Sequence, residues 1–575
     1  MSDREDAPPG TQLSRRTFLG WSALGGALAT LGTMETALAG ETPQETGPAT
    51  PALSDLEEAT IPRLQEGMRS GRYTARALVE AYLARISMLD QEGPALNQII
   101  ELNPEALAIA DRLDAERKAR KLRGPLHGIP ILLKDNIDTA DRMATTAGSL
   151  ALAGSIATHD AFIAARLRAA GAILLGKTNM SEWANFRSNR SSSGWSGRGG
   201  QGRNPYALSH NTSGSSSGSA AAVAANLCAA AIGTETDGSI VSPASCCGIV
   251  GIKPTLGLLS RSGIIPIAHS QDTAGPMART VTDAAILLGV LAGVDPRDEA
   301  TREGPGANKA RAQTDYTRFL DPNSLRGARL GIARAPTVHV DPESVRLLDA
   351  AVALMKDRGA IVIDPVEIAT SGKFDDAEQE VLLHEFKADL NRYLSALGPG
   401  VAVHSLAEVI AWNEQHRAEE LQFFGQELMI MAEDRGPLTS KTYLDALAHC
   451  RELSRAQGID AALQQHRLDA IVAVTNGPAW PIDLVNGDHY TGGSSTLAAV
   501  AGYPSITVPA GHIFGLPVGI SFFGTAFSEP QLLKLAYAYE QVSRARRPPT
   551  FRPAPEIPDR AYRRAPAPAP GKTAR

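Results

Sequence analysis

The sequence has few cysteines. Only Cys228, Cys246, Cys247 and Cys450 occur among 575 residues, and no two of them have the paired spacing of a zinc site. So few cysteines in so long a chain also argue against a disulfide framework. Cys246 and Cys247 lie in a stretch of small and apolar residues, so we expect them to be buried, unreactive thiols.

A surplus of charge of one sign is also missing. The 56 Lys and Arg residues against 62 Asp and Glu residues give a net charge of −6, so electrostatics offers no case for binding nucleic acid or an anionic membrane. With 43% hydrophobic and 5% aromatic residues, the composition is that of an ordinary globular protein. The body of the chain has neither an internal repeat nor a long linker, which favours one large catalytic domain.

Long hydrophobic runs are absent. The run from Phe18 to Leu31 is interrupted by glycines and is too short for a stable membrane span. It follows Arg15-Arg16 and ends at Ala37-Leu38-Ala39, a small-x-small cleavage pattern. This order resembles a twin-arginine export signal. It predicts a signal peptide over residues 1–39, passage through the twin-arginine export machinery, and a periplasmic or secreted protein.

Composition also marks the remaining boundaries. Residues 40–53 are rich in Pro, Thr and Glu, which is typical of a linker, and residues 553–575 are rich in Pro, Ala and Arg, which predicts a disordered tail. Residues 54–552 then form the catalytic domain. In its first part the apolar residues recur at helical spacing; later, short apolar runs such as Ile129–Leu133 and Ile471–Val474 alternate with Ala-rich helical segments. That alternation predicts an α/β fold, a sheet covered by helices.

Three short motif matches fail on their context. Residues 171–178 fit a phosphate-binding loop, but a helical pattern precedes them and a buried-strand run fills their middle. Residues 197–202 fit a dinucleotide-binding glycine pattern without a preceding strand. Ser216 fits a hydrolase nucleophile elbow, but polar turn sequence leads into it. The sequence contains neither H-E-x-x-H nor S-x-x-K, which removes the commonest zinc-protease and β-lactamase-type interpretations.

Three segments within about a hundred residues remain. In the first, residues 128–136, Lys134 ends a buried strand. The second is the Ser/Gly stretch 212–219 before an Ala-rich helix, and the third is 233–240, continued by 243–255. Taken singly, each has an ordinary explanation: a strand-end cation, a helix-capping loop and a structural bend. A turn that presents successive backbone N–H groups can also form an oxyanion hole.

Together these segments resemble the amidase signature family of Ser-Ser-Lys hydrolases. The resemblance runs from about Ile61 to Pro549, and residues 233–240, 264–267 and 270–278 look most like the peptide amidase branch. Ser213 and Ser217 depart from the glycines of many members but leave Ser215 and Ser216 in register. The resemblance implies a large mixed β-sheet covered by α-helices on both faces.

The resemblance also implies roles for individual residues. It gives Lys134 as general base, Ser215 as bridging serine and Ser239 as nucleophile, with the oxyanion hole formed by backbone N–H groups of Thr236, Asp237, Gly238 and Ser239. Supporting hydrogen bonds are expected from Ser216, Asp135 and Asn136, and the peptide bond between Gly214 and Ser215 is expected to be cis. A lysine that is neutral at pH 7 costs roughly 4.6 kcal/mol from its ordinary pKa, so burial must lower that pKa. The mechanism requires no metal and no organic cofactor.

The leading hypothesis is an exported amidase that hydrolyses a carboxamide to carboxylate plus ammonia or amine, rather than an endoprotease. Its substrate is a small-molecule or peptide amide, the C-terminal amide of a peptide among them. An esterase or aryl acylamidase with the same triad stays open as an alternative. The export signal argues against an amidase-like component of a tRNA amidotransferase, and the complete triad against a non-catalytic protein. Residues 295–469, including 423–427 and Tyr443, are expected to contribute to the substrate pocket, but no motif there names a ligand.

Overall fold

The structure is a computed structural model that describes residues 53–303, 313–335 and 341–556. The predicted signal peptide, residues 40–52 of the linker and residues 557–575 of the tail lie outside this range. Among the described helices, none has the length and apolar character to cross a membrane.

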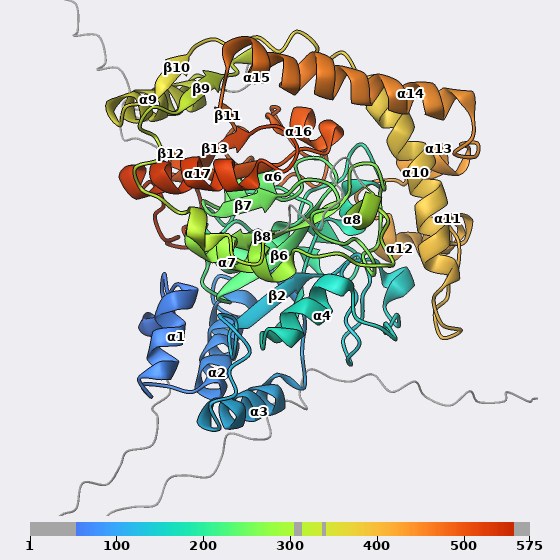
Figure 1. The fold of residues 1–575 in the computed structure, drawn as a ribbon. Coiled ribbons are helices and arrows are strands. Elements are labelled where there is room, and N and C mark those ends of the chain that lie inside the picture. Colours follow the sequence, from blue (N-terminus) through green and yellow to red (C-terminus); the bar gives the residue numbers. More distant parts are fainter. Residues whose placement is uncertain (1–52, 304–312, 336–340, 557–575) are drawn as a thin grey trace, which may run out of the picture. The chain divides into compact units, whose positions relative to one another are not determined.

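Eleven strands form one mixed sheet (Figure 1). In spatial order they are β1 (Ile99–Leu102), β3 (Ile173–Thr178), β2 (Pro130–Lys134), β6 (Ala230–Glu235), β8 (Thr273–Ala278), β7 (Val250–Lys253), β12 (Ser505–Ile513), β13 (Leu516–Phe523), β11 (Ala470–Val474), β9 (Arg329–Ile332) and β10 (Ile361–Ile363). β2 runs parallel to β3 and β6, and β9 runs parallel to β10 and β11. The other neighbours are antiparallel, which confirms the expected mixed sheet.

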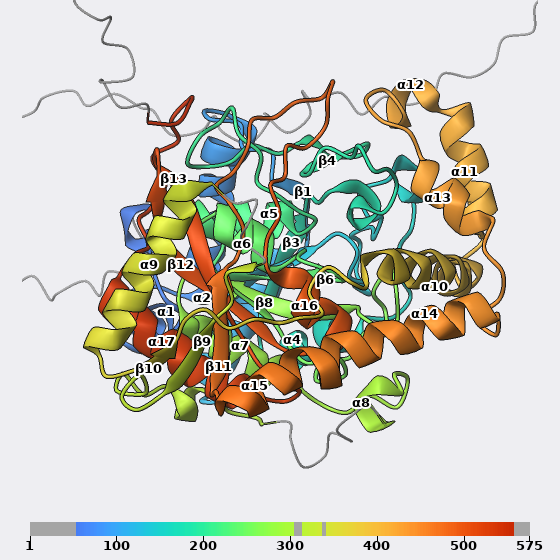
Figure 2. The same ribbon diagram turned by 90° about the horizontal axis from the view of Figure 1, so that it is seen from above.

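Helices cover both faces of the sheet (Figure 2). Those that contact its strands are α2 (Ala75–Ile86), α3 (Ala106–Lys118), α4 (Phe162–Ala169), α5 (Ser217–Ala224), α6 (Val241–Cys246), α7 (Val281–Leu291), α9 (Pro342–Asp357) and α17 (Glu529–Ser543). The body also contains α1 (Ile61–Arg69), α8 (Ala300–Glu303), α15 (Asp460–His466) and α16 (Ser495–Ala501). α5 and α6 contact each other and the central strands, whereas α7 packs against α4 and α17. A separate two-stranded hairpin pairs β4 (Trp195–Ser196) with β5 (Gly200–Gln201).

Five helices build a lobe beside the sheet, drawn in yellow and orange in Figure 1. They are α10 (Asp375–Ser395), α11 (Leu406–Gln415), α12 (Arg417–Glu420), α13 (Glu427–Glu433) and α14 (Lys441–Arg451). Arg187, on the body side, forms ion pairs with Glu182 and with Glu420 of α12, and all three side chains are fully buried. Its guanidinium also lies 4.0 Å from the ring of Phe424. This buried network ties the lobe to the body.

The local sequence explains how the sheet edge is built. Every residue of β2 is buried, as expected for an apolar strand between two neighbours, and Lys134 is its last residue. Because β2 and β6 are parallel neighbours, their carboxyl ends meet at one edge. α5 can pack closely against the backbone of Asn179 because its Gly218 has no side chain. A Cβ at that position would lie 2.4 Å from the carbonyl oxygen of Asn179. These packing relations gather the three sequence segments at one place.

The structure tests two interpretations made from the sequence. Residues 173–178 form strand β3, so the phosphate-loop match is not a loop. The predicted tail starts too early, because Pro553 accepts a hydrogen bond from Ser209 N at 3.1 Å and Glu556 N donates to Phe514 O at 2.7 Å. Residues 553–556 therefore contact the body, because their backbone groups form hydrogen bonds with it.

Candidate active site

Lys134 is completely buried at the end of β2. Its Nζ donates to Ser215 Oγ at 2.7 Å and to Thr234 Oγ1 at 2.9 Å. Burial lowers the pKa of Lys134 to about 7, against the opposing effect of the Asp272 and Glu235 carboxylates. A sizeable fraction of the amine is therefore neutral near neutral pH and can accept a proton from a hydroxyl.

Ser215 and Ser216 lie immediately before α5. The peptide bond between Gly214 and Ser215 is cis, as expected. Ser216 Oγ donates to Thr234 O at 3.0 Å and accepts from Thr234 N at 3.1 Å. Both serine side chains are fully buried, so the start of α5 is held against β6.

Ser239 lies in the turn between β6 and α6. Gly238 has a φ of +75°, in the left-handed region that favours glycine, and a Cβ there would come within 3.0 Å of Ser495 Oγ. The carbonyl of Ser239 accepts from Ser216 N at 3.1 Å. Within the described part of the chain, the backbone N–H groups from Thr236 to Ser239 donate to no acceptor. They are free to receive a developing oxyanion.

Of the two residues that follow Lys134, one joins this arrangement. Asn136 Nδ2 donates to Thr234 Oγ1 at 3.0 Å and so reaches the lysine through the threonine. Asp135 turns away: it accepts from Thr146 Oγ1 and Gly148 N and contacts Arg198 at 3.6 Å. The expected supporting role at the triad therefore has a geometric basis for Asn136, whereas Asp135 stabilises a neighbouring loop.

Thr234 is a contact residue that the sequence interpretation missed. Its Oγ1 accepts from Lys134 and Asn136, its carbonyl accepts from Ser216, and its N donates to Ser216. The one signal in the sequence was a polar side chain that follows the apolar run 229–233 inside a strand pattern.

Ser239 borders a cavity of about 420 Å³. Its wall combines hydroxyl side chains with apolar and aromatic ones, among them Ser188, Ser191, Ser193, Ser213, Ser242, Ser495, Thr236, Thr496, Phe186, Ile267, Leu382, Trp480 and Tyr490. Asp488, at the same wall, accepts from Trp480 Nε1 at 3.0 Å and from Ser193 N. A cleft of this kind offers hydrogen bonds to a polar chain and small apolar surfaces to side chains.

The expected pocket segment 295–469 contributes little to this cavity. Leu382 borders it, but Phe424 packs on Trp195 with ring centroids 5.1 Å apart, and the hydroxyl of Tyr443 donates to Glu385 at 2.7 Å. Most of the wall comes instead from residues 184–193 and 480–496. Residues 423–427 and Tyr443 do not line this cavity, whereas the same segment contributes Arg297, Asp298, Asp389, Arg392 and Tyr393 to a second cavity beside it.

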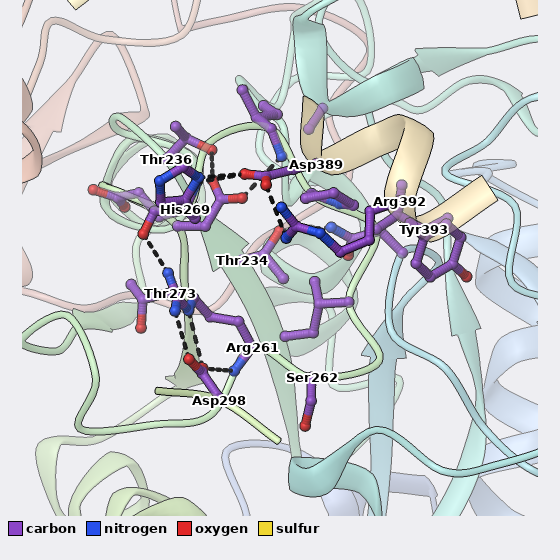
Figure 3. Close-up of a pocket in the computed structure, with 18 of the residues that line it drawn as sticks. Thr234, Thr236, Arg261, Ser262, His269, Thr273, Asp298, Asp389, Arg392 and Tyr393 are labelled. Carbon is purple, nitrogen blue, oxygen red and sulfur yellow. Dashed lines mark hydrogen bonds and ion pairs between the residues drawn. The ribbon is translucent and has the colours of Figure 1, made fainter. Parts of the chain in front are cut away.

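A second cavity of about 320 Å³ adjoins the first and shares Ala184, Thr236 and Ile267 with it (Figure 3). At its rim, His269 Nδ1 lies 2.7 Å from Asp389 Oδ2. Together with Glu385, these two residues have the spacing of a metal site. Protein groups already occupy the ligand atoms, because Tyr443 donates to Glu385 and Arg392 pairs with Asp389 at 3.1 Å. This cluster joins α10 to the cavity wall.

Comparison with known proteins agrees with this geometry. The Amidase family model matches residues 77–533, and the chain belongs to that family. The crystal structure of native peptide amidase from Stenotrophomonas maltophilia is 54% identical, has a TM-score of 0.81, and is matched over 86% of this chain and 99% of that one. The chain is thus an amidase-signature hydrolase acting on carbon–nitrogen bonds.

Two further relatives show how widely the similarity extends. A protein of Arabidopsis thaliana named as a probable amidase is 45% identical over 504 residues, covering 86% of this chain and 92% of its own. The crystal structure of an amidase family protein from Bacillus anthracis is 38% identical, has a TM-score of 0.78, and is matched over 87% of this chain and 93% of that one.

Proposed function

We propose that this protein hydrolyses carboxamides, with C-terminal peptide amides as the preferred class, through an acyl-enzyme on Ser239. The observation that carries the proposal is the 2.7 Å contact between Lys134 Nζ and Ser215 Oγ, made by a lysine whose burial lowers its pKa to about 7. A base of that pKa at a hydroxyl is the requirement for serine activation.

In acylation, neutral Lys134 accepts the proton of Ser215, which in turn takes the proton of Ser239. The Ser239 oxygen attacks the amide carbon, and the carbonyl oxygen becomes an oxyanion that the N–H groups of residues 236–239 receive. Ser215 then returns a proton to the departing nitrogen, so ammonia or an amine leaves as a neutral molecule. Ser239 is left esterified by the acyl group.

Deacylation runs over the same groups. A water molecule gives its proton to the Ser215–Lys134 relay and attacks the ester carbon. The oxyanion forms again in the turn, and Ser239 recovers its proton as the carboxylic acid leaves. The relay serves as base in one direction and as acid in the other. Every proton is handled by the chain's own side chains.

The cavity supports a peptide over a long fatty acyl chain. Its wall carries hydroxyls such as Ser191, Ser193 and Ser242, which can bond to the amide groups of a peptide backbone. These hydroxyls already bond within the protein: Ser191 Oγ donates to Ser188 O, Ser193 Oγ accepts from Asn185 Nδ2, and Ser242 Oγ pairs with Ser213 Oγ. Their remaining hydrogen-bonding capacity serves a peptide and gives nothing to a fatty acyl chain. The similarity to a peptide amidase supports the same class.

The decisive experiment measures ammonia release from a dipeptide amide and a fatty-acid amide, and arylamine release from an N-aryl amide. It compares the wild type with Ser239→Ala, Ser215→Ala and Lys134→Ala, with the exposed Ser209→Ala as control. We expect each triad variant to lose at least about 10³-fold in kcat/KM and the control to match the wild type. An active Ser239→Ala enzyme would overturn the mechanism.

The esterase alternative is tested with the methyl ester of the same acyl group. Hydroxylamine competes with water for the acyl-enzyme and gives a hydroxamate in place of the acid. If the amide and the ester form the same acyl-enzyme, both give the same ratio of hydroxamate to acid. If the wild type cleaves only the ester, the triad stands and the amide assignment falls.

We further propose export by the twin-arginine route, supported by the order of Arg15-Arg16, the short apolar run and the small-residue motif at 37–39. The test is fractionation of cells that produce the full chain or its Arg15→Lys/Arg16→Lys variant. Activity outside the cytoplasm is expected for the natural sequence only. Equal distribution of both would exclude this route.

A further inference from the structure

Glu235 closes the turn that carries Ser239. It is the last residue of β6, is 1% exposed, and its Oε2 accepts from Ile240 N at 2.7 Å and from Val241 N at 3.0 Å. These amides follow Ser239 directly and begin α6. The carboxylate therefore joins the entry of the turn to its exit, with Ser239 between the two anchor points.

Asp272 holds the other side of the same turn. Its Oδ1 accepts from Thr236 Oγ1 at 2.6 Å, and its Oδ2 accepts from Ile267 N at 2.8 Å and Ala268 N at 2.9 Å. Thr236 stands in the wall shared by the two cavities, as Figure 3 shows from the second cavity. Asp272 therefore fixes Thr236 against the loop that carries Ile267.

We propose that Glu235 and Asp272 are a pair of positioning residues that brace the Thr236–Ser239 turn from both sides and act on Lys134 through their charge. Neither side chain needs to touch the substrate. The proposal rests on the function proposed above, because it assigns what holds the nucleophile and the oxyanion-binding amides in place.

The two carboxylates are also the charges that oppose the effect of burial on the Lys134 pKa. Other charged groups face them: Lys253 of β7 and Asp237 of the turn face Glu235, and Arg261 faces Asp272. Burial raises the pKa of Asp272 to about 6 and that of Glu235 above its usual value. In its charged form each carboxylate favours the ammonium form of Lys134.

Charge and bracing can be separated by mutation. Glu235→Gln and Asp272→Asn keep the shape but remove the charge. Glu235→Asp and Thr236→Val keep the charge but break part of the brace. The control is Asp298→Asn, which makes the same change at the second cavity, where Asp298 pairs with Arg261 rather than with the turn.

The readout is kcat and KM for a peptide amide from about pH 5 to 10, together with thermal unfolding of each variant. All four variants should lower the plateau kcat about tenfold or more, with KM nearly unchanged. Only Glu235→Gln and Asp272→Asn should also move the acid limb of the pH–rate profile, where the rate rises as Lys134 loses its proton. The shift should be roughly 0.5–1 pH unit to lower pH, because Lys134 then loses its proton more easily. Asp298→Asn should change neither.

Each result decides something. If folded Glu235→Gln and Asp272→Asn enzymes keep the wild-type limb and plateau, the inference is overturned. If one of them does not fold, the partial variant on its own side carries the comparison: Glu235→Asp for the Glu235 side and Thr236→Val for the Asp272 side. A wild type that hydrolyses no amide would defeat the proposed function itself, which is a different outcome from a wild-type profile in the variants.

Discussion

Lys134 Nζ and Ser215 Oγ lie 2.7 Å apart although their residues are 81 positions apart in the chain, and both side chains are fully shielded from solvent. Burial is what makes this contact chemically useful. In water the lysine would be an ammonium that only donates hydrogen bonds. Buried at the end of β2, it can lose its proton, and the neutral amine can then accept the proton of Ser215.

The first prediction concerns pH. Lys134 acts as a base only in its neutral form, so the amidase rate should rise with pH through an apparent pKa of about 7. Below about pH 6, kcat/KM should fall about tenfold for each pH unit. A profile of kcat/KM against pH, with stability checked at each end, provides the measurement. An apparent pKa near that of a free lysine would contradict it.

The second prediction concerns Thr234. Thr234→Val removes the acceptor of Lys134 Nζ and Asn136 Nδ2 without changing the volume. The ammonium form loses a hydrogen bond of about 1.5–3 kcal/mol, so the acid limb should move about one pH unit lower and kcat should fall.

Lys177 supplies the control for this variant. It is another buried lysine, and its Nζ donates to Thr145 Oγ1 at 2.8 Å. Thr145→Val should lower the melting temperature and leave the pH profile in place. If both valine variants shift the limb equally, a direct role for Thr234 at Lys134 is wrong.

The third prediction concerns the turn. Gly238→Ala introduces a Cβ at a φ of +75° and 3.0 Å from Ser495 Oγ. The strain of about 1 kcal/mol or more falls on the oxyanion-binding amides, so kcat should fall about 10- to 100-fold. Gly372→Ala is the matched control, because Gly372 has a φ of +73° and no atom within 4 Å of the added Cβ. Both variants should lose some stability, but only the first should lose kcat.

The fourth prediction concerns the helical lobe. Arg187→Met leaves the carboxylates of Glu182 and Glu420 buried without their cation, which should cost about 3–5 kcal/mol of unfolding free energy. Arg417→Met, which breaks a surface pair with Glu414, should change the melting temperature little. Calorimetry or denaturant unfolding compares the two. Equal loss of unfolding free energy in both variants would show that the buried network stabilises the protein no more than the surface pair does.

Much of the site could be predicted from the sequence because its segments are local. The apolar run 129–133 indicated a buried strand with Lys134 at its end, and the Ser/Gly stretch before an Ala-rich helix indicated the start of α5. The structure has both. Helix and strand periodicities depend on neighbours along the chain, so one sequence suffices to see them.

The cavity walls could not be predicted in this way. Residues 184–193 and 480–496 carry no periodic pattern, yet they form most of the wall around Ser239. Residues 423–427 were expected at the pocket, but they do not line this cavity, and Phe424 packs on Trp195 instead. Which side of a segment meets a ligand depends on packing partners that are distant in sequence.

The sequence by itself determined the element types, the buried strand end at Lys134 and the family resemblance on its motifs. Only the tertiary structure decided that Asn136 and not Asp135 reaches Lys134 through Thr234, and that Glu235 and Asp272 hold the turn of Ser239. The physical reason is that a polar side chain takes its role from the donor or acceptor that burial leaves within about 3 Å. That distance is set when strands and loops far apart in the chain pack together.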